Sequence, residues 1–266
     1  MEFSVGKQIC ENKKKEIIEN KKKCSYKTLE KLLSTNLSKK RKFKDLLKES
    51  QKNKKNFIIG EIKKSSPSAG NIIKKKYYPE QIAKTYENSG IGAISVLTEK
   101  KYFEGDIDHI SLIKKTTNLP VLRKDFLYDP YQIIESRAAG ADAALLIVAM
   151  LEPTQLNELI SAAKSVWIQP LVEVHNEHEL EIALSADSEI IGINHRNLKT
   201  FSVDTSLSIR LKPHIPSGKM VVAESGIHSA EDVLPLKKAG INAILVGEAL
   251  VTASDTTAKV KELAGV

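Results

Sequence analysis

Eight short apolar runs constrain the fold of this chain more than any other feature of its sequence. They begin after residue 55 and recur at intervals of about 25 residues. They are rich in Ile, Val and Leu and show little alternation, which is typical of parallel strands buried on both faces. The runs are NFIIGEI (56–62), GAISVLT (92–98), LPVLRKDF (119–126), DAALLIVA (142–149), IQPLVEV (168–174), EIIGINH (189–195), KMVVAES (219–225) and NAILVGEAL (242–250).

The stretches between these runs carry the signals of helix starts and stops. Several begin with Pro or Ser ahead of an acidic or Gln-bearing turn, and several end in Gly. The expected helices cover residues 79–90, 108–116, 130–140, 153–165, 176–186, 203–211, 229–240 and, as the eighth, 249–266.

Eight strand–helix repeats in 211 residues predict a (β/α)8 barrel. A doubly wound open sheet is the structural alternative, but it normally has about five or six strands and often a Gly-rich first turn. No GxGxxG follows the first run, and the chain ends one helix after the eighth. We therefore expect one barrel domain over residues 1–266.

Residues 1–55 precede the first run and are strongly basic. They hold 18 of the 41 Lys and Arg residues and only 7 of the 33 Asp and Glu residues. The total charge is +8, so the other 211 residues carry a small net negative charge. Apolar residues from Ile17 to Leu47 recur among the lysines at spacings of three and four, as amphipathic helices require. We expect a helical extension that covers the barrel. A lysine-rich arm that binds nucleic acid is the less favoured alternative.

The composition is that of a folded domain, with 41% hydrophobic and 28% charged residues. The longest apolar run, AALLIVAML at 143–151, has nine residues, whereas a membrane span needs about 20. The first residues lack the apolar core of a signal peptide, so we expect a cytoplasmic protein. Cys10 and Cys24 match no metal or redox spacing, and this favours reduced, structural thiols.

Polar residues follow most of the apolar runs, where a (β/α)8 barrel has its active site. One such residue is readily explained as a solvated strand end or a structural ion pair. Ionisable residues at or just beyond the ends of six of the eight runs indicate a functional site, because buried charge is costly unless it is paired or used. They are Glu61, Lys63, Arg123, Lys124, Asp125, Glu173, Arg196, Glu224 and Glu248.

Glu61 and Lys63 lie two residues apart in the first run, so both side chains are expected on one face of the strand. The following Ser-Pro-Ser-Ala-Gly is expected to form a loop over the site, with Pro67 and Gly70 setting its turns.

Two fragments predict a phosphate site. ESGI (224–227) and VGEAL (246–250) each lead from a strand towards a helix. The N–H groups of Ser225, Gly226, Gly247 and Glu248, with a helix N-terminus, would then bind the anion. The alternative is that Gly simply ends many such turns.

Seven segments in order resemble the indole-3-glycerol-phosphate synthases, lyases of tryptophan biosynthesis. They are EIKKSSPSAG, SVLTEKKYFEG, PVLRKDFLYDPYQIIESRAAGADAALLIV, LVEVH, IGINHRNLKTF, VAESGI and VGEAL. The N-terminal ICENKKKEIIENKKK and RKFKDLLKES also resemble the family's extra helices, so the similarity covers nearly the whole chain. LRKDF and EIKKSSPS are the most specific parts, whereas ESGI and VGEAL occur in other phosphate-binding barrels.

The resemblance implies a carboxy-lyase that closes an indole ring. The substrate would be 1-(2-carboxyphenylamino)-1-deoxyribulose 5-phosphate, and the products indole-3-glycerol phosphate, carbon dioxide and water. No metal or organic cofactor and no membrane partner is expected, and a monomer is the expected state.

The resemblance also implies roles for single residues. Lys124 matches the family's general acid and Glu173 its general base. Lys63 matches a lysine that contacts the substrate carboxylate and donates a proton, while Glu61 and Asn194 orient the lysines and the substrate hydroxyls. Lysine and glutamate can serve in this way if the cavity moves their pKa values towards neutrality.

The remaining matches would bind the two ends of the substrate. The residues that line the substrate and phosphate site are Ser66, Arg196, Glu224 and Ser225. The residues that form an apolar slot for the anthranilate ring are Phe103, Phe126, Leu145 and Leu198, for which plain barrel core is the alternative. His195 departs from the pattern and is expected to point away from the cavity.

The nearest alternative is another phosphosugar barrel, such as phosphoribosylanthranilate isomerase. That function would require a Cys/Asp pair at strand ends, whereas both cysteines here precede the barrel.

Overall fold

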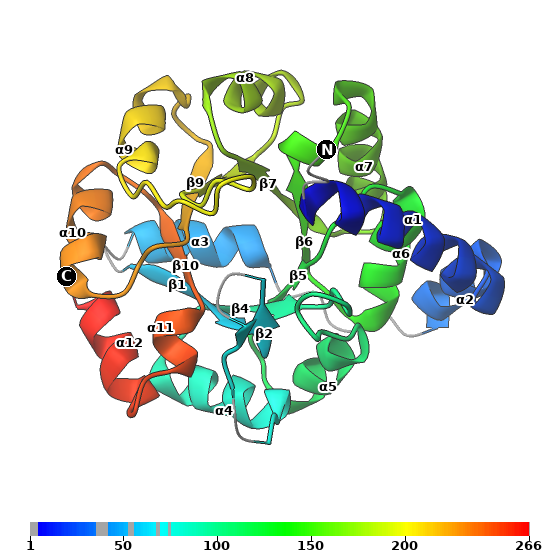
Figure 1. The fold of residues 1–266 in the computed structure, drawn as a ribbon, viewed down its shortest axis with the longest axis horizontal. Helices are drawn as coiled ribbons and strands as arrows, with labels where there is room; N and C mark the ends of the chain where they lie inside the picture. Colours follow the sequence, from blue (N-terminus) through cyan, green and yellow to red (C-terminus); the bar gives the residue numbers. More distant parts are fainter. Residues whose placement is uncertain (1–4, 36–41, 53–55, 68–69, 74–75, 266) are drawn as a thin grey trace.

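A closed barrel of eight parallel strands forms the centre of the molecule (Figure 1). The computed structural model describes residues 5–35, 42–52, 56–67, 70–73 and 76–265. Around the barrel the strands follow the order β1-β10-β9-β8-β7-β6-β5-β4, which confirms the predicted (β/α)8 fold. The strands are β1 Phe57–Ile62, β4 Ala93–Leu97, β5 Val121–Lys124, β6 Ala143–Ile147, β7 Gln169–Val174, β8 Ile190–Asn194, β9 Met220–Glu224 and β10 Ala243–Val246.

Helices surround the barrel at nearly the predicted positions. They are α4 Pro79–Ser89, α5 Asp108–Thr116, α6 Pro130–Ala139, α7 Pro153–Ser165, α8 Glu177–Ser185, α9 Leu207–Leu211, α10 Ala230–Lys238, α11 Glu248–Val251 and α12 Thr256–Ala264, with single 3-10 turns at Val148–Met150 and Lys212–His214. As predicted, Pro begins α4, α6 and α7, and Gly in the left-handed region ends α4 and α6.

Two helix predictions were wrong in extent. The stretch 249–266 forms α11 and α12 instead of one helix, because the Asp255 side chain accepts the N–H of Ala258 and starts a new helix there. The helix expected at 203–211 begins only at Leu207. Val203 forms a bridge with Arg196, and this holds the preceding residues in a loop.

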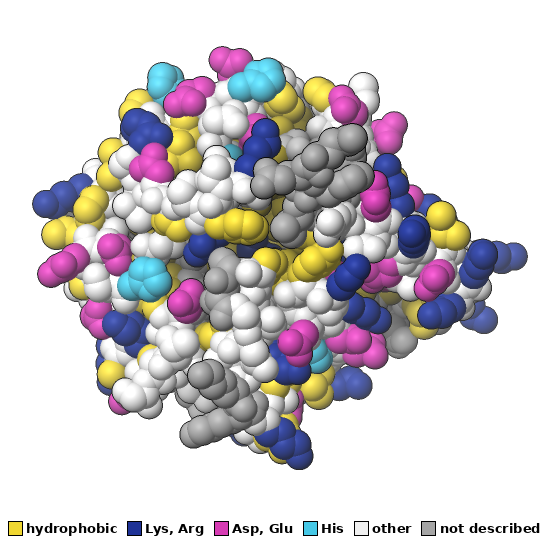
Figure 2. Space-filling model, in the orientation of Figure 1, with side chains coloured by type: hydrophobic (Ala, Val, Ile, Leu, Met, Phe, Trp, Pro, Cys, Tyr) yellow, Lys and Arg dark blue, Asp and Glu magenta, His cyan; other side chains and the backbone are white. Residues whose placement is uncertain are grey.

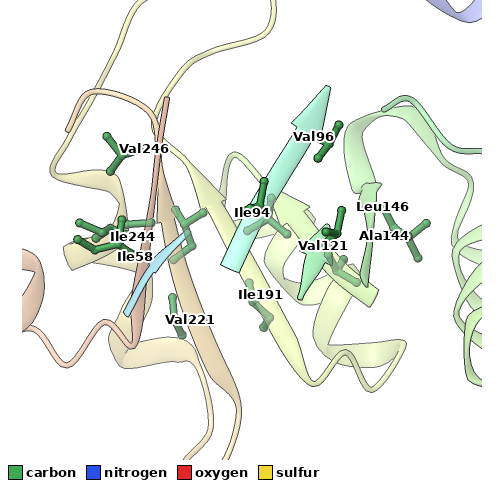
Figure 3. Close-up of a cluster of buried hydrophobic side chains, with 14 of the residues drawn as sticks. Ile58, Ile94, Val96, Val121, Ala144, Leu146, Ile191, Val221, Ile244 and Val246 are labelled. Carbon is green, nitrogen blue, oxygen red and sulfur yellow. The ribbon is translucent and has the colours of Figure 1, made fainter. Parts of the chain in front are cut away.

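The alternation of strand residues separates two apolar layers. Side chains such as Ile58, Ile94 and Ile191 point outward and pack under the helices (Figure 3). Ile59 and Leu122 point inward and fill the barrel. Because side chains alternate along a strand, the inward position of Ile59 also directs Glu61 into the barrel.

Three helices precede the barrel: α1 Val5–Lys23, α2 Tyr26–Thr35 and α3 Phe43–Lys52. Phe43 and Leu47 of α3 pack against Phe57 at the amino end of the barrel. The α1–α2 pair lies across α6 on the near face in Figure 1, where the Tyr26 ring meets Tyr131 edge-on at 5.5 Å.

A small antiparallel pair, β2 Ser65–Ser66 and β3 Gly70–Asn71, forms in the loop after β1. Gly70 has a φ of 63°, so it supplies the left-handed turn expected of it. Across the described part of the chain, no helix combines the length and apolar character needed to span a membrane.

Candidate active site

A cavity of about 440 Å³ opens at the carboxyl ends of the strands, and all sixteen predicted site residues line it. Figure 2 shows apolar side chains, with basic atoms among them, near the centre of this face. The sixteen residues are Glu61, Lys63, Ser66, Phe103, Lys124, Phe126, Leu145, Glu173, Asn194, Arg196, Leu198, Glu224, Ser225, Gly226, Gly247 and Glu248.

Two lysines and three carboxylates form the charged centre of the cavity. Lys63 Nζ lies 2.7 Å from Glu61 Oε1, which confirms that the two side chains share a face. Lys124 Nζ lies 3.1 Å from Glu173 Oε2 and 3.3 Å from Glu224 Oε2. Four alternate strands of the barrel, β1, β5, β7 and β9, thus bring together groups that are up to 163 residues apart in the sequence.

Two glycines leave room for these carboxylates. A Cβ added to Gly192 of β8 would lie 2.3 Å from Glu224 Oε1. A Cβ added to Gly247 would lie 2.6 Å from Glu61 Oε1. Neither distance is compatible with any other residue unless the carboxylate moves, so the absent side chains are part of the geometry of the site.

Lys124 and Glu173 do not have pKa values near neutrality. Burial opposes the charge on Lys124, but Glu173, Glu224 and Glu61 outweigh burial and raise its pKa above the ordinary value. Burial likewise opposes the charge on Glu173, but Lys124 and His175 hold its pKa well below the usual range. Because the two groups stabilise each other's charge, both pKa values are moved away from neutrality in this arrangement.

Glu224 is the carboxyl group of this cluster whose pKa lies closest to neutral pH. Burial raises its pKa to about 7, with Lys124 opposing the shift and Glu173 adding to it. Although Lys124 lies nearby, neither Glu224 oxygen has an aligned hydrogen-bond partner among the described residues. A buried carboxyl group in this condition is suited to bind or release a proton when a ligand arrives.

The ends of β9 and β10 have the geometry expected of an anion site. Ser225 and Gly226 both adopt positive φ, 70° and 72°, so the backbone turns sharply beside the cavity. The Ser225 hydroxyl donates to Asn194 Oδ1 at 2.8 Å. The short helix α11 begins immediately after Gly247, and the N–H groups of a first helical turn have no intrahelical acceptors.

The four predicted ring-binding residues form an apolar wall. The Phe103 and Phe126 rings lie 6.2 Å apart, tilted by 46°. Leu145 belongs to the apolar interior of the barrel, and Phe126 and Leu198 pack against that interior, so these three side chains are at once core and cavity lining. The buried Glu99 accepts the N–H of Phe103 at 3.1 Å and so fixes the loop that carries it.

Helix α1 contributes residues that sequence reasoning did not assign to the site. Ile9 and Cys10 line the cavity although they precede the barrel. The argument that both cysteines lie away from the strand ends therefore missed Cys10, whose pKa is raised by burial, so that the thiol keeps its proton.

Lys13, also on α1, is fully buried and lies 2.9 Å from Asp125, next to Lys124. Its burial shows that the lysines of the extension do not all face solvent. A signal was present in the sequence: Lys13 lies four residues from both Ile9 and Ile17 and so shares their helical stripe.

Several further cavity residues had no sequence signal of their own. They are Leu97, Ile147, Ala149, Met150, Lys199, Phe201, Ile227, His228, Leu245 and Val246. Asp125 and Pro67, which the sequence placed at a strand end and in the loop over the site, also line the cavity. His195 does not line the cavity, as expected. Its ring lies between the Ser225 carbonyl oxygen and the Ser208 hydroxyl. Among the described residues, no group of three or more His, Cys, Asp or Glu side chains is arranged to hold a metal ion.

The closed barrel, with charged groups gathered at its carboxyl end, defines the class of (β/α)8-barrel enzymes. One solved structure of this fold is that of the tryptophan synthase alpha chain from Legionella pneumophila subsp. pneumophila. It matches with a TM-score of 0.62 over 85% of this chain and 96% of that chain. The two sequences are 12% identical, so this similarity shows the fold alone.

The family follows from sequence comparison. A family model described as indole-3-glycerol phosphate synthase matches residues 6–263. A protein of that name from Campylobacter fetus subsp. fetus is 48% identical over 231 residues, which cover 87% of this chain and 88% of the relative. Another from Caldanaerobacter subterraneus subsp. tengcongensis is 48% identical over 241 residues, 91% of each chain. The chain belongs to the indole-3-glycerol phosphate synthase family, which confirms the resemblance drawn from its sequence.

Proposed function

We propose that this protein converts 1-(2-carboxyphenylamino)-1-deoxyribulose 5-phosphate into indole-3-glycerol phosphate, carbon dioxide and water, in tryptophan biosynthesis. Membership of the family supports this reaction. The observation that carries the proposal is the position of Lys124, between Glu173 and Glu224 in a cavity that Lys63 also lines. Ring closure, loss of water and aromatisation need an acid and a base at one place, and this cluster supplies both.

Lys124 is the general acid that protonates the ribulose carbonyl, and Glu173 is the base that removes the ring proton. The two groups are paired at 3.1 Å, so a substrate bound between them has to separate the ammonium from the carboxylate. Loss of this contact weakens the opposition to burial, which lowers the pKa of a lysine and raises that of a glutamate. Both pKa values should therefore move back towards neutrality at the moment of use.

Lys63 attracts the anthranilate carboxylate and donates a proton late in the reaction, while Glu61 holds its ammonium group at 2.7 Å. Asn194 orients the substrate hydroxyls together with Ser225, to which it is hydrogen-bonded. Glu224, with a pKa of about 7, carries a proton that it can share with a hydroxyl of the bound substrate.

The two ends of the substrate lie on opposite sides of this charged centre. The phosphate binds to the backbone N–H groups of Ser225, Gly226, Gly247 and Glu248, with Arg196 and Ser66 beside it. The anthranilate ring fills the apolar slot formed by Phe103, Phe126, Leu145 and Leu198. Both assignments are supported by the cavity that these residues share.

The protein would act in the cytoplasm as a monomer on this small phosphorylated substrate, without binding nucleic acid. Residues 1–266 would then be one barrel domain, with residues 1–55 as an extension over it. The burial of Lys13 and of Leu47 in contacts with the barrel supports a covering role for the extension rather than that of a free basic arm.

The test is the appearance of indole absorbance and fluorescence when purified protein meets the carboxyphenylamino substrate. Lys124→Ala should lower kcat by at least about 10²-fold, the scale of a lost general acid. Lys115→Ala, at an exposed lysine on α5, is the matched control and should leave kcat unchanged. Circular dichroism checks that both variants fold. No indole product from the wild-type protein would refute the proposed reaction, and near-normal turnover by Lys124→Ala would remove the assigned acid.

A further inference from the structure

His175 lies between two carboxylates at the end of β7, beside the active-site cavity. Its Nδ1 is 2.9 Å from Glu179 Oε2, and its Nε2 is 3.2 Å from Glu173 Oε1. The Nδ1 contact has hydrogen-bond geometry, whereas the Nε2 contact is at ion-pair distance without an aligned hydrogen bond. Two carboxylates this close to one ring favour its charged form. The arrangement therefore fits an imidazolium cation.

Glu179 is fixed by the start of α8 rather than by the cavity. Asn176 is the N-cap of this helix, and its side chain accepts the N–H of Glu179 at 2.9 Å. Asn176 Nδ2 donates to Glu179 Oε1 at 2.8 Å, and the backbone N–H of His175 donates to Glu179 Oε2 at 2.8 Å. This capping network holds Glu179, and through it the His175 ring, in one place.

His175 does not line the cavity, whereas Glu173 does. Any effect of His175 on the reaction must therefore pass through Glu173. The other cation on Glu173 is Lys124, which faces the cavity at 3.1 Å and is the group that the substrate draws away under the proposed function. His175 stays in place when that happens, because α8 holds it.

We propose that His175, fixed by Glu179, is a positioning residue that keeps the Glu173 carboxylate ionised and aimed into the cavity after the substrate has separated it from Lys124. This role rests on the proposed function, in which Glu173 is the base. Without His175, the buried Glu173 would have no adjacent cation at that stage. Burial would then favour the protonated acid, which cannot accept a proton.

The surroundings of His175 agree with a permanent positive charge. Burial alone would remove the proton, but the hydrogen bonds and charges of Glu173 and Glu179 raise the pKa of His175 to about 10. Among the described residues these two, one on β7 and one on α8, are the charged groups paired with the ring. At neutral pH the imidazolium should therefore be fully formed.

The first experiment measures kcat and KM against pH for His175→Gln, Glu179→Gln and a control, Glu181→Gln. Glu181 is an exposed carboxylate on the same helix. Loss of an adjacent opposite charge moves a pKa by about 1–3 units. The acid limb of kcat should therefore move to higher pH by about that amount in His175→Gln, with kcat about 10-fold lower for each unit on the acid side.

Glu179→Gln should move the acid limb in the same direction, by less. The glutamine carbonyl can still accept the two hydrogen bonds from His175, and the Asn176 side chain still accepts the N–H of residue 179. The bond from Asn176 Nδ2 to Oε1 is lost together with the negative charge that stabilises the imidazolium. If His175→Gln does not fold, the pH profile of Glu179→Gln tests the proposal instead. KM should stay within about twofold in both, because neither residue touches the substrate, and Glu181→Gln should behave as wild type.

The second experiment follows the His175 ring by nuclear magnetic resonance and needs no activity. In the wild-type protein the ring should stay protonated above about pH 8, and in Glu179→Gln it should lose its proton at a lower pH. A neutral ring at pH 7, an unchanged acid limb in both variants, or an effect confined to KM would overturn the proposal. A wild-type protein that made no indole product would refute the proposed function instead, and the ring titration would still report the charge of His175.

Discussion

Replacing Gly192 by alanine would test the geometry behind Glu224 with a single methyl group. Gly192 lies in the middle of β8, and an added Cβ would be 2.3 Å from Glu224 Oε1. An ordinary contact at such a position is at least 3.4 Å, so the carboxylate must withdraw by about 1 Å. The other Glu224 oxygen is 3.3 Å from Lys124 Nζ, so the change should disturb the catalytic cluster directly.

A misplacement of about 1 Å costs about 10²-fold in rate, or about 2.7 kcal/mol in the activation free energy. Overpacking should also lower the free energy of unfolding by about 1–3 kcal/mol. The two effects are separable. Indole formation measures kcat, and thermal denaturation followed by circular dichroism measures stability, with a fall in Tm of about 2–4 °C for each kcal/mol.

Gly92→Ala is the matched control, since its Cβ would lie 2.4 Å from the Phe57 ring at the opposite end of the barrel. It should lose stability and keep kcat. A double-mutant cycle then isolates the carboxylate, because Gly192→Ala should add nothing to the loss caused by Glu224→Ala if it acts only through Glu224. Wild-type kcat in Gly192→Ala, or full additivity in the cycle, would refute this reasoning.

Three further predictions concern single charges. Lys63→Arg keeps the positive charge but gives up a readily released proton, so kcat should fall while affinity for a non-reactive substrate analogue is retained; unchanged kcat with intact binding would remove the donor role. Glu224 has a folded-state pKa of about 7 against an ordinary 4.5, so the folded protein binds an extra proton between these values and its stability should decrease as pH rises through them. Glu224→Gln should lose that decrease, as urea unfolding at about pH 5 and about pH 8 would show. Lys13→Met should lower the free energy of unfolding by about 3 kcal/mol. This is near the low end for a broken buried ion pair, because Arg123 still contacts Asp125. An unchanged denaturation midpoint would contradict a stabilising ion pair.

The barrel and the location of its site were predictable because the sequence pattern maps directly onto the fold. Parallel strands all end at one rim, so a polar residue at the end of any apolar run had to lie near the others. Glu61, Lys124 and Glu173 come from three such runs and meet in the structure without any local sequence relation. Periodicity alone predicts one helix over 249–266, but Asp255, a residue that starts helices well, begins a second helix there.

Other features depended on distances that no sequence pattern contains. Helical periodicity predicts an apolar stripe on α1, but it does not predict which part of the barrel that stripe contacts. Ile9 and Cys10 were therefore not expected in the cavity. The directions of the pKa shifts were also out of reach. The lysine and glutamate expected to approach neutrality are moved away from it by a contact of 3.1 Å between two residues 49 positions apart.

The charge balance of the cavity indicates how an anionic substrate can enter it. Lys63 is paired with Glu61, and Lys124 with Glu173, so neither lysine is free to meet a new carboxylate. The third carboxyl group, Glu224, decides the sign of the whole cluster. If Glu224 is ionised, the cluster has one excess negative charge, which repels an anionic substrate. If Glu224 is protonated, as a pKa of about 7 allows, the cluster is neutral. Because the substrate carboxylate must compete for a lysine, its binding is favoured by the protonated form of Glu224, and by linkage the bound substrate should in turn raise the pKa of Glu224. Under the proposed function, substrate affinity should therefore fall as pH rises through the pKa of Glu224.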